Sequence, residues 1–145
     1  MKLAINKIQF PVTAFGFGRR VGVWTQGCSI GCAGCVNRDT WATQPEDFVE
    51  IEEIARAYSR WPDADGVTIS GGEPFEQVEA LELLVSTTRQ SYSGDVLVFS
   101  GFEFEELEKR HSKTLALLDV VVAGPYRGDA GNELTLRGSD NQTIH

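Results

Sequence analysis

The chain has 145 residues, which is enough for one domain with its own hydrophobic core. Its 13 basic and 21 acidic residues give a net charge of −8, which disfavours non-specific binding to nucleic acid or to an anionic membrane. The sequence has no run of about 18 apolar residues, no internal repeat and no secretory signal pattern at its start. We therefore expect a single cytoplasmic domain over residues 1–145, with its cysteines reduced.

The first half of the chain predicts three strands and one helix. Residues 3–10 alternate loosely between apolar and polar and are typical of an edge strand that ends before Pro11. Residues 21–25 indicate a buried strand that leads directly into a cysteine-rich loop. A helix is predicted to start at residues 43–45, with Phe48, Ile51, Ile54, Ala55 and Tyr58 at helical spacing. Residues 67–70 form the next short apolar strand.

The second half continues the same alternation of strands and helices. After Gly71 and Gly72, a helix is predicted with Val78, Leu81, Leu84 and Val85 on one face. Strands are expected at 96–99 and 120–123, with short helical pieces at 104–110 and 115–118 between them. From Gly124 the chain is rich in glycine and polar residues, and the composition of Arg137 to Gln142 is compatible with an unstructured polar tail.

Apolar strands separated by amphipathic helices indicate βα repeats around a parallel sheet. A complete eight-stranded barrel needs roughly 200 residues or more, so we expect an α/β fold built as a partial, open barrel of about four to six mainly parallel strands. Ligands of such sheets bind at the carboxyl ends of the strands. The predicted strand ends bring four segments to that edge: the cysteine loop, Gly71-Gly72, Ser100-Gly101 and Gly124.

The three cysteines of the chain, Cys28, Cys32 and Cys35, lie within eight residues. An odd number argues against a disulfide framework, and a structural zinc site would need a fourth ligand from His111, His145 or a carboxylate. Thiolates are also the usual ligands of iron–sulfur clusters, and simple ferredoxins use four cysteines per cluster. The pattern favours an iron–sulfur cluster with one iron free of protein ligands, and it leaves zinc as an alternative.

The segment Ser70-Gly71-Gly72-Glu73-Pro74 follows a predicted strand. Its glycines permit close approach of a ligand to the main chain, and Glu73 offers an acceptor for an ammonium group. The simpler interpretation is a tight βα turn in which Pro74 begins a helix and Glu73 caps it.

These two motifs together resemble the radical S-adenosylmethionine (SAM) enzymes. The resemblance implies that Cys28, Cys32 and Cys35 ligate a [4Fe–4S] cluster whose open iron binds the methionine moiety of SAM. It also implies that one electron then cleaves SAM to a 5′-deoxyadenosyl radical. The cofactor-binding residues that we assign by this resemblance are Gly34, Val36, Gly71, Gly72, Glu73, Pro74, Ser100 and Gly101. The family usually has an aromatic residue beside the third cysteine, where this chain has Val36.

Further segments are similar to the short glycyl-radical activating enzymes, above all those of anaerobic (class III) ribonucleotide reductase. They include Val23 to Cys28, Cys35 to Trp41, Phe99 to Phe102 and Arg137 to Gln142. For Arg137 to Gln142 the resemblance implies an alternative to the unstructured tail, in which the segment folds over the cofactor edge and meets the partner. This resemblance implies a glycyl radical enzyme as partner and an electron donor such as flavodoxin or ferredoxin. Ala123 departs from that group, which tends to have an acidic residue there. Two alternatives therefore stay open: a radical SAM maturase of a peptide or another protein, and a non-enzymatic zinc or iron–sulfur adaptor.

Overall fold

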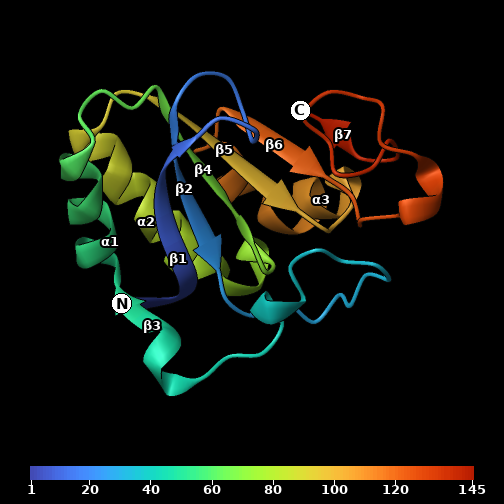
Figure 1. The fold of residues 1–145 in the computed structure, drawn as a ribbon. Helices are drawn as coiled ribbons and strands as arrows, with labels where there is room; N and C mark the ends of the chain where they lie inside the picture. Colours follow the sequence, from blue (N-terminus) through green and yellow to red (C-terminus); the bar gives the residue numbers. More distant parts are fainter.

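A computed structural model describes residues 1–145 as one mixed α/β unit with a seven-stranded sheet. The sheet order is β3-β1-β2-β4-β5-β6-β7 (Figure 1). Its strands are β1 (Lys2–Val12), β2 (Arg20–Thr25), β3 (Phe48–Glu50), β4 (Gly66–Gly71), β5 (Asp95–Ser100), β6 (Val120–Ala123) and β7 (Thr143–Ile144). The helices are α1 (Ile51–Ala57), α2 (Val78–Ser91) and α3 (Phe104–Leu115), with short 3-10 turns between elements. No helix is both long and apolar enough to cross a membrane.

The centre of the sheet is parallel, as expected from the sequence. β2, β4, β5 and β6 pair in parallel, while β1, β3 and β7 are added antiparallel at the two sides. The sheet stays open, so the expected partial α/β barrel is confirmed. Seven strands are present where four to six were expected. The strands β3 and β7 were not predicted, because segments of three and two residues are too short to show a strand pattern.

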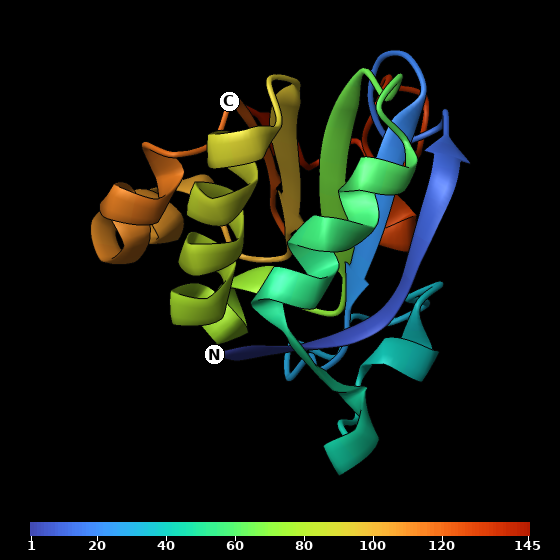
Figure 2. The same cartoon turned by 90° about the vertical axis from the view of Figure 1, so that its left-hand side faces the viewer.

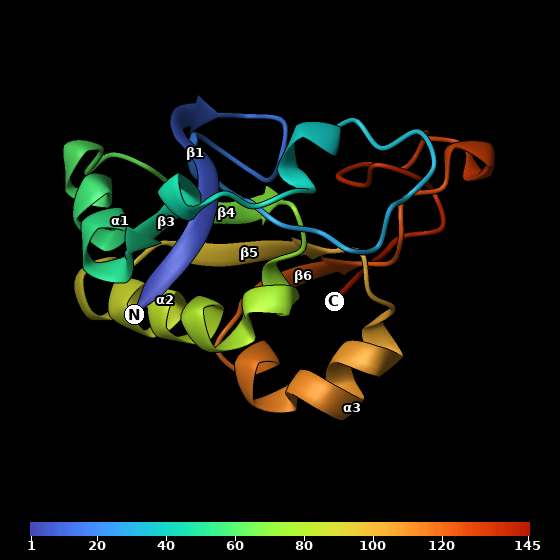
Figure 3. The ribbon, with the colours of Figure 1, turned by 90° about the horizontal axis from the view of Figure 1, so that it is seen from below.

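All three helices cover one face of the sheet (Figures 2 and 3). Alternate residues of the parallel strands, such as Val21, Val67, Val96 and Val121, pack with them into the main hydrophobic core. The opposite face carries the other half of each alternation, including Trp24, Thr68 and Phe99. The cysteine loop and the segment after β6 lie beyond that opposite side in Figure 3. The open half of the barrel is thus bounded by loops rather than by helices.

Two local predictions were wrong. Phe48 is not helical: residues 48–50 pair with Lys2–Ala4 as β3, and the helix begins only at Ile51. The first strand does not stop before Pro11 but continues to Val12, and over Lys2–Ala4 it lies between two strands. In both cases pairing with a distant strand overrides the local pattern. The helix face formed by Leu81, Leu84 and Val85 is confirmed, since all three are fully buried.

Candidate active site

The carboxyl ends of the parallel strands meet around one cavity that contains all three cysteines. Its lining comes from every segment that follows a parallel strand, and from the loop between β1 and β2. The lining residues are Phe15, Cys28, Ile30, Cys32, Cys35, Val36, Asn37, Ser70, Gly71, Gly72, Glu73, Phe99, Ser100, Gly101, Gly124, Tyr126, Gly138 and Gln142. The convergence predicted from strand ends therefore exists in the fold.

The cysteine loop is anchored at both ends by main-chain hydrogen bonds. Gly27 N donates to Thr40 O at 2.6 Å, and Cys28 N donates to Trp41 O at 3.0 Å. The buried side chain of Gln26 adds bonds from its amide nitrogen to the carbonyls of Asp39 and Ala42. These contacts join residues 26–28 to residues 39–42. The three thiols therefore lie on a loop whose two ends are held together.

The donor chemistry of the loop fits an iron–sulfur cluster. All three thiols are half-buried and unpaired with one another. Asn37 N donates to Cys35 Sγ at 3.4 Å, and the main chain of Ile30 and Gly31 hydrogen-bonds to Cys28. Burial nevertheless raises the pKa of the Cys28 thiol, while these N–H donors lower it. Metal coordination deprotonates a thiol outright, and N–H groups aimed at sulfur stabilise the charge of a cluster.

The three thiols line one cavity. In a four-iron cluster each thiolate binds its own iron, so the ligands stay apart. A zinc site would instead draw four ligands around one ion. Three thiolates therefore satisfy three irons of such a cluster, whereas zinc would need a fourth ligand.

Gly71 and Gly72 are needed where the turn after β4 crosses the end of β2. A Cβ on Gly71, whose φ is +100°, would lie 2.6 Å from the main chain of Thr25, and one on Gly72 would lie 2.3 Å from Gly27 O. Gly72 N and Glu73 N donate to Thr25 O and Gly27 O at 2.8 and 2.9 Å. The close approach that these glycines permit is thus to the base of the cysteine loop, which fixes the turn against it.

Glu73 caps the turn that follows, as the simpler interpretation predicted. Its side chain is 1% exposed and accepts a hydrogen bond from Phe75 N at 3.0 Å. Ser100 Oγ and Gly101 N donate to the same carboxylate at 2.9 and 2.6 Å. Burial raises the pKa of Glu73 to about 7, although the three hydrogen bonds act in the opposite direction.

The segment after β6 folds back over the site instead of forming an unstructured tail. Gln142 Nε2 donates to Gly124 O, and Asn141 Nδ2 donates to Pro125 O, each at 2.9 Å. Ser139 is fully buried and accepts from Arg127 N at 3.0 Å. This places Gly138 and Gln142 on the cavity wall, so the second of the two sequence interpretations holds.

Most of the assigned site residues lie together. The three cysteines, Val36 and the two glycine-containing strand ends all line the cavity. Gly34 and Pro74 do not: a Cβ on Gly34 would face Tyr126, and Pro74 is buried in the turn. Sequence reasoning did not assign Phe15, Phe99 or Tyr126 to the cofactor. Phe99 could have been found from strand alternation, because it faces away from the helices like Leu97.

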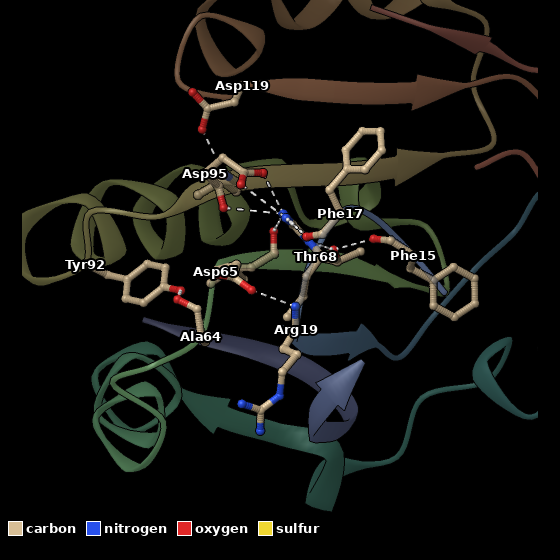
Figure 4. A network of polar contacts seen from close by, with 12 residues as sticks. Phe15, Phe17, Arg19, Ala64, Asp65, Thr68, Tyr92, Asp95 and Asp119 are labelled. Atoms are coloured by element: carbon tan, nitrogen blue, oxygen red, sulfur yellow. Dashed lines mark hydrogen bonds and ion pairs between the residues drawn. The ribbon is translucent and has the colours of Figure 1, made fainter. Parts of the chain in front are cut away.

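A second polar network occupies the amino ends of the same strands, and sequence reasoning missed it (Figure 4). Its centre is Arg20, which is 2% exposed and donates to Thr68 Oγ1 at 2.7 Å and to Val67 O at 3.0 Å. The guanidinium also pairs with Asp95 at 2.6 Å and bonds to Phe17 O. Nothing in the local sequence distinguishes Arg20 from its exposed neighbour Arg19.

Comparison with known proteins identifies the family. A family model described as "4Fe-4S single cluster domain" matches residues 14–145. The chain belongs to this family. The [4Fe–4S] cluster is thereby confirmed, and the alternative of a zinc adaptor is not supported.

Individual relatives of this 4Fe–4S single cluster domain protein extend the match. The chain is 30% identical to the anaerobic ribonucleoside-triphosphate reductase-activating protein of Haemophilus influenzae, with 97% of each chain covered. The namesake from Enterobacteria phage T4 is 28% identical, covering 89% of this chain and 85% of the relative. The pyruvate formate-lyase-activating enzyme of Streptococcus mutans is 29% identical over 97% of this chain and 57% of its own length.

Among solved structures, QueE from Escherichia coli superposes with a TM-score of 0.55 at 19% identity. The match covers 69% of this chain and 53% of QueE, so the chain spans about half of that structure and the likeness concerns the fold. Together these matches confirm the resemblance to radical SAM enzymes of the glycyl-radical activating group. SAM is accordingly the second cofactor beside the cluster.

Proposed function

We propose that the protein is the activating enzyme of an anaerobic ribonucleotide reductase. It would abstract a hydrogen atom from one glycine of that partner and leave a glycyl radical there. The observation that carries the proposal is the cavity at the strand ends, where three thiols and two glycine-containing turns meet on the open side of the sheet. Relatives named as activators of the anaerobic reductase match it over nearly their whole length.

The residues divide the work between them. Cys28, Cys32 and Cys35 would hold the cluster. When bound, the cluster supplies the electron that cleaves SAM to methionine and a 5′-deoxyadenosyl radical. The main chain around Gly71 and Gly72 would hold the methionine amino group, beside the cysteine loop to which it is hydrogen-bonded. Phe15, Phe99 and Tyr126 give the cavity an apolar, aromatic lining that restricts water near the reacting atoms.

The open side of the barrel and the net charge of the chain bear on its partners. We propose a protein substrate whose glycine-bearing loop enters through the open side of the barrel, and flavodoxin or ferredoxin as electron donor. The net charge of −8 supports neither nucleic acid nor an anionic membrane as a partner. Three free thiols in a redox-active loop suit the reducing cytoplasm, which we propose as the location.

A second candidate is a radical SAM maturase that modifies a peptide or another protein. Ala123 favours it, because the resemblance to the reductase activators implies an acidic residue at this strand end, and the residue here is apolar and 1% exposed. The cofactor chemistry would be unchanged and only the target would differ.

The test is anaerobic reconstitution with iron and sulfide, followed by reduction with SAM and the anaerobic reductase of the same cell. We expect 5′-deoxyadenosine from the loaded protein and a glycyl radical signal in electron paramagnetic resonance (EPR) when the reductase is present. Formation of 5′-deoxyadenosine without a glycyl radical would move the protein to the maturase candidate. A fully loaded, reduced protein that leaves SAM intact would refute both.

A further inference from the structure

A second cavity lies on the open face of the sheet, apart from the cavity that contains the thiols. Its volume is about 400 Å³, which is within the range of ligand-binding pockets. None of its lining residues lines the thiol-containing cavity. We call it the Phe17 cavity, and its lining residues are Phe17, Arg20, Asp95, Leu97, Val120, Thr135, Leu136, Arg137 and Ile144.

The same segments of the chain line both cavities. In β5, Leu97 lines the Phe17 cavity and Phe99 lines the thiol-containing cavity. The loop between β1 and β2 is shared in the same way by Phe17 and Phe15, and the segment after β6 passes from one cavity to the other within residues 135–138. A strand advances about 3.3 Å per residue, so Leu97 and Phe99 are about 7 Å apart along β5. The two cavities are therefore neighbours on one face.

The Phe17 cavity is mainly apolar, and its apolar surface continues to the solvent. Five of its nine lining residues are hydrophobic, and Phe17 and Ile144 are 85% and 39% exposed. Leu136 is the one non-glycine residue of the chain with a positive φ, at +69°. Such conformations are uncommon for residues with a side chain and are concentrated at functional sites. Exposed apolar surface beside a cavity is typical of an interaction site.

The charges of the Phe17 cavity leave one cation without an acidic partner. The Asp95 carboxylate accepts from Arg20 Nη1 at 3.1 Å and from Arg20 Nη2 at 2.6 Å, so these two charges neutralise one another. Arg137 donates only to main-chain carbonyls, from Nε to Gln142 O at 2.7 Å and from Nη1 to Thr135 O at 3.2 Å. A guanidinium that still has free N–H groups beside apolar surface suits an apolar side chain with a carboxylate next to it.

We propose that the Phe17 cavity binds an apolar side chain of the protein substrate, two to four residues from the glycine that enters the thiol-containing cavity. An acidic residue beside that side chain would pair with Arg137. The spacing follows from β5, where Leu97 and Asp95 precede Phe99 by two and four residues, and an extended substrate segment advances at the same rate per residue. The proposal rests on the proposed function for the existence of the glycine-bearing segment.

The first experiment fills the Phe17 cavity from its exposed edge with Thr135→Trp. We expect the Kd of the cluster-loaded protein for the anaerobic reductase of the same cell to rise at least about tenfold, because an apolar side chain can no longer be buried there. Iron content and the 5′-deoxyadenosine formed without the reductase should not change. Ser93→Trp places the same side chain at an exposed position outside both cavities and should leave all three measurements unchanged.

The second experiment locates the bound side chain with synthetic peptides centred on the radical glycine of the reductase. Alanine at one apolar position, two to four residues from the glycine, should raise the Kd for the parent protein roughly tenfold. The same alanine should change the Kd for Thr135→Trp less than about twofold, because the cavity is already filled. The amide in place of the neighbouring acid should weaken binding to the parent roughly threefold. Equal losses in both proteins, or a loss only at more distant positions, would overturn the proposal.

The outcomes separate this proposal from the proposed function. Binding of the reductase to Thr135→Trp as tightly as to the parent would overturn the Phe17 cavity as a substrate site and leave the activase reaction standing. A changed sedimentation coefficient of Thr135→Trp alone would also overturn it, because the cavity would then be an interface between copies of this chain. A reductase that binds through the Phe17 cavity but gains no glycyl radical would refute the proposed function only, and a reductase that does not bind the parent would refute both.

Discussion

The two ends of the parallel strands differ in their residue types and in what those residues bond to. At the amino ends, the charged groups bond to one another: Arg20 has partners in Thr68, Val67 and Asp95. At the carboxyl ends, glycines and half-buried thiols line a cavity, and the one fully buried acid, Glu73, bonds only to main chain and a serine. The polar groups at the amino ends are satisfied within the protein, whereas the carboxyl ends leave a cavity for a ligand.

The amino ends of the strands should contribute mainly to stability, and the carboxyl ends mainly to activity. Substitutions at the amino ends should lower the free energy of unfolding with little direct effect on cofactor binding. Substitutions in the cysteine loop should impair cofactor binding with little effect on the free energy of unfolding, because that loop contributes little to the core. The two ends can therefore be tested against each other with the same pair of measurements.

The largest expected effect is that of Cys32→Ala. Losing one of three thiolate ligands should abolish the cluster and with it SAM cleavage. The free energy of unfolding of the cluster-free protein should change by less than about 1 kcal/mol, because Cys32 is half-exposed. Iron content and urea unfolding check the two halves of this prediction. Ala33→Ser, a change beside the ligand that keeps all three thiols, should retain iron. A variant that keeps its cluster would mean that Cys32 is not a ligand.

Arg20→Met should give the largest loss of stability. It leaves Asp95, Val67 O and Phe17 O without their cationic donor, at a cost of about 2–4 kcal/mol. The estimate lies below that for a fully buried pair because the Asp95 side chain is 43% exposed. Arg19→Met is the matched control and should cost under about 1 kcal/mol, since its side chain is exposed and contacts only the Phe10 ring. Urea unfolding would contradict the comparison if both arginines cost the same.

The parallel centre of the sheet and the edge that carries the site were predicted from the sequence, because both depend on patterns within single segments. β4, β5, β6 and α2 each carry their pattern within their own residues. The site follows from the rule that ligands bind at strand ends. β3 was missed because residues 48–50 become a strand only by pairing with residues 2–4. The partners of Glu73 were hidden for the same reason, since Ser100 lies 27 residues away.

The charged network was the least predictable feature. Arg19 and Arg20 are neighbours of the same type, and only strand alternation sends Arg20 inward over Gly66 while Arg19 stays exposed. A Cβ at Gly66 would lie within 2.6 Å of the guanidinium, so the glycine makes the room that the arginine needs. That match between distant residues leaves no local pattern to detect.

The smallest expected effect concerns Asp119, which precedes β6 at the amino ends. Burial tends to raise its pKa, but hydrogen bonds from Val96 N and Arg89, each at 2.7 Å, outweigh burial and hold the pKa below its usual value. A pKa that is lower in the folded state stabilises the protein above the unfolded value of 3.8, and this stabilisation is lost as pH falls through the folded value. Asp119→Asn should therefore cost up to about 1 kcal/mol near pH 7, because the pair is partly exposed.

The difference between Asp119→Asn and the parent should shrink as pH falls below about 4, because the unfolded chain then binds a proton that the folded carboxylate does not yet bind, and it should vanish below the folded pKa. Urea unfolding between pH 3 and 7 measures it, with Asp63→Asn as an exposed control of the same chemistry. A difference that stayed constant with pH would show that Asp119 acts through its shape alone. The amino ends would then be held by packing and by Arg20, and the contrast with the cysteine edge would rest on one residue rather than on a network.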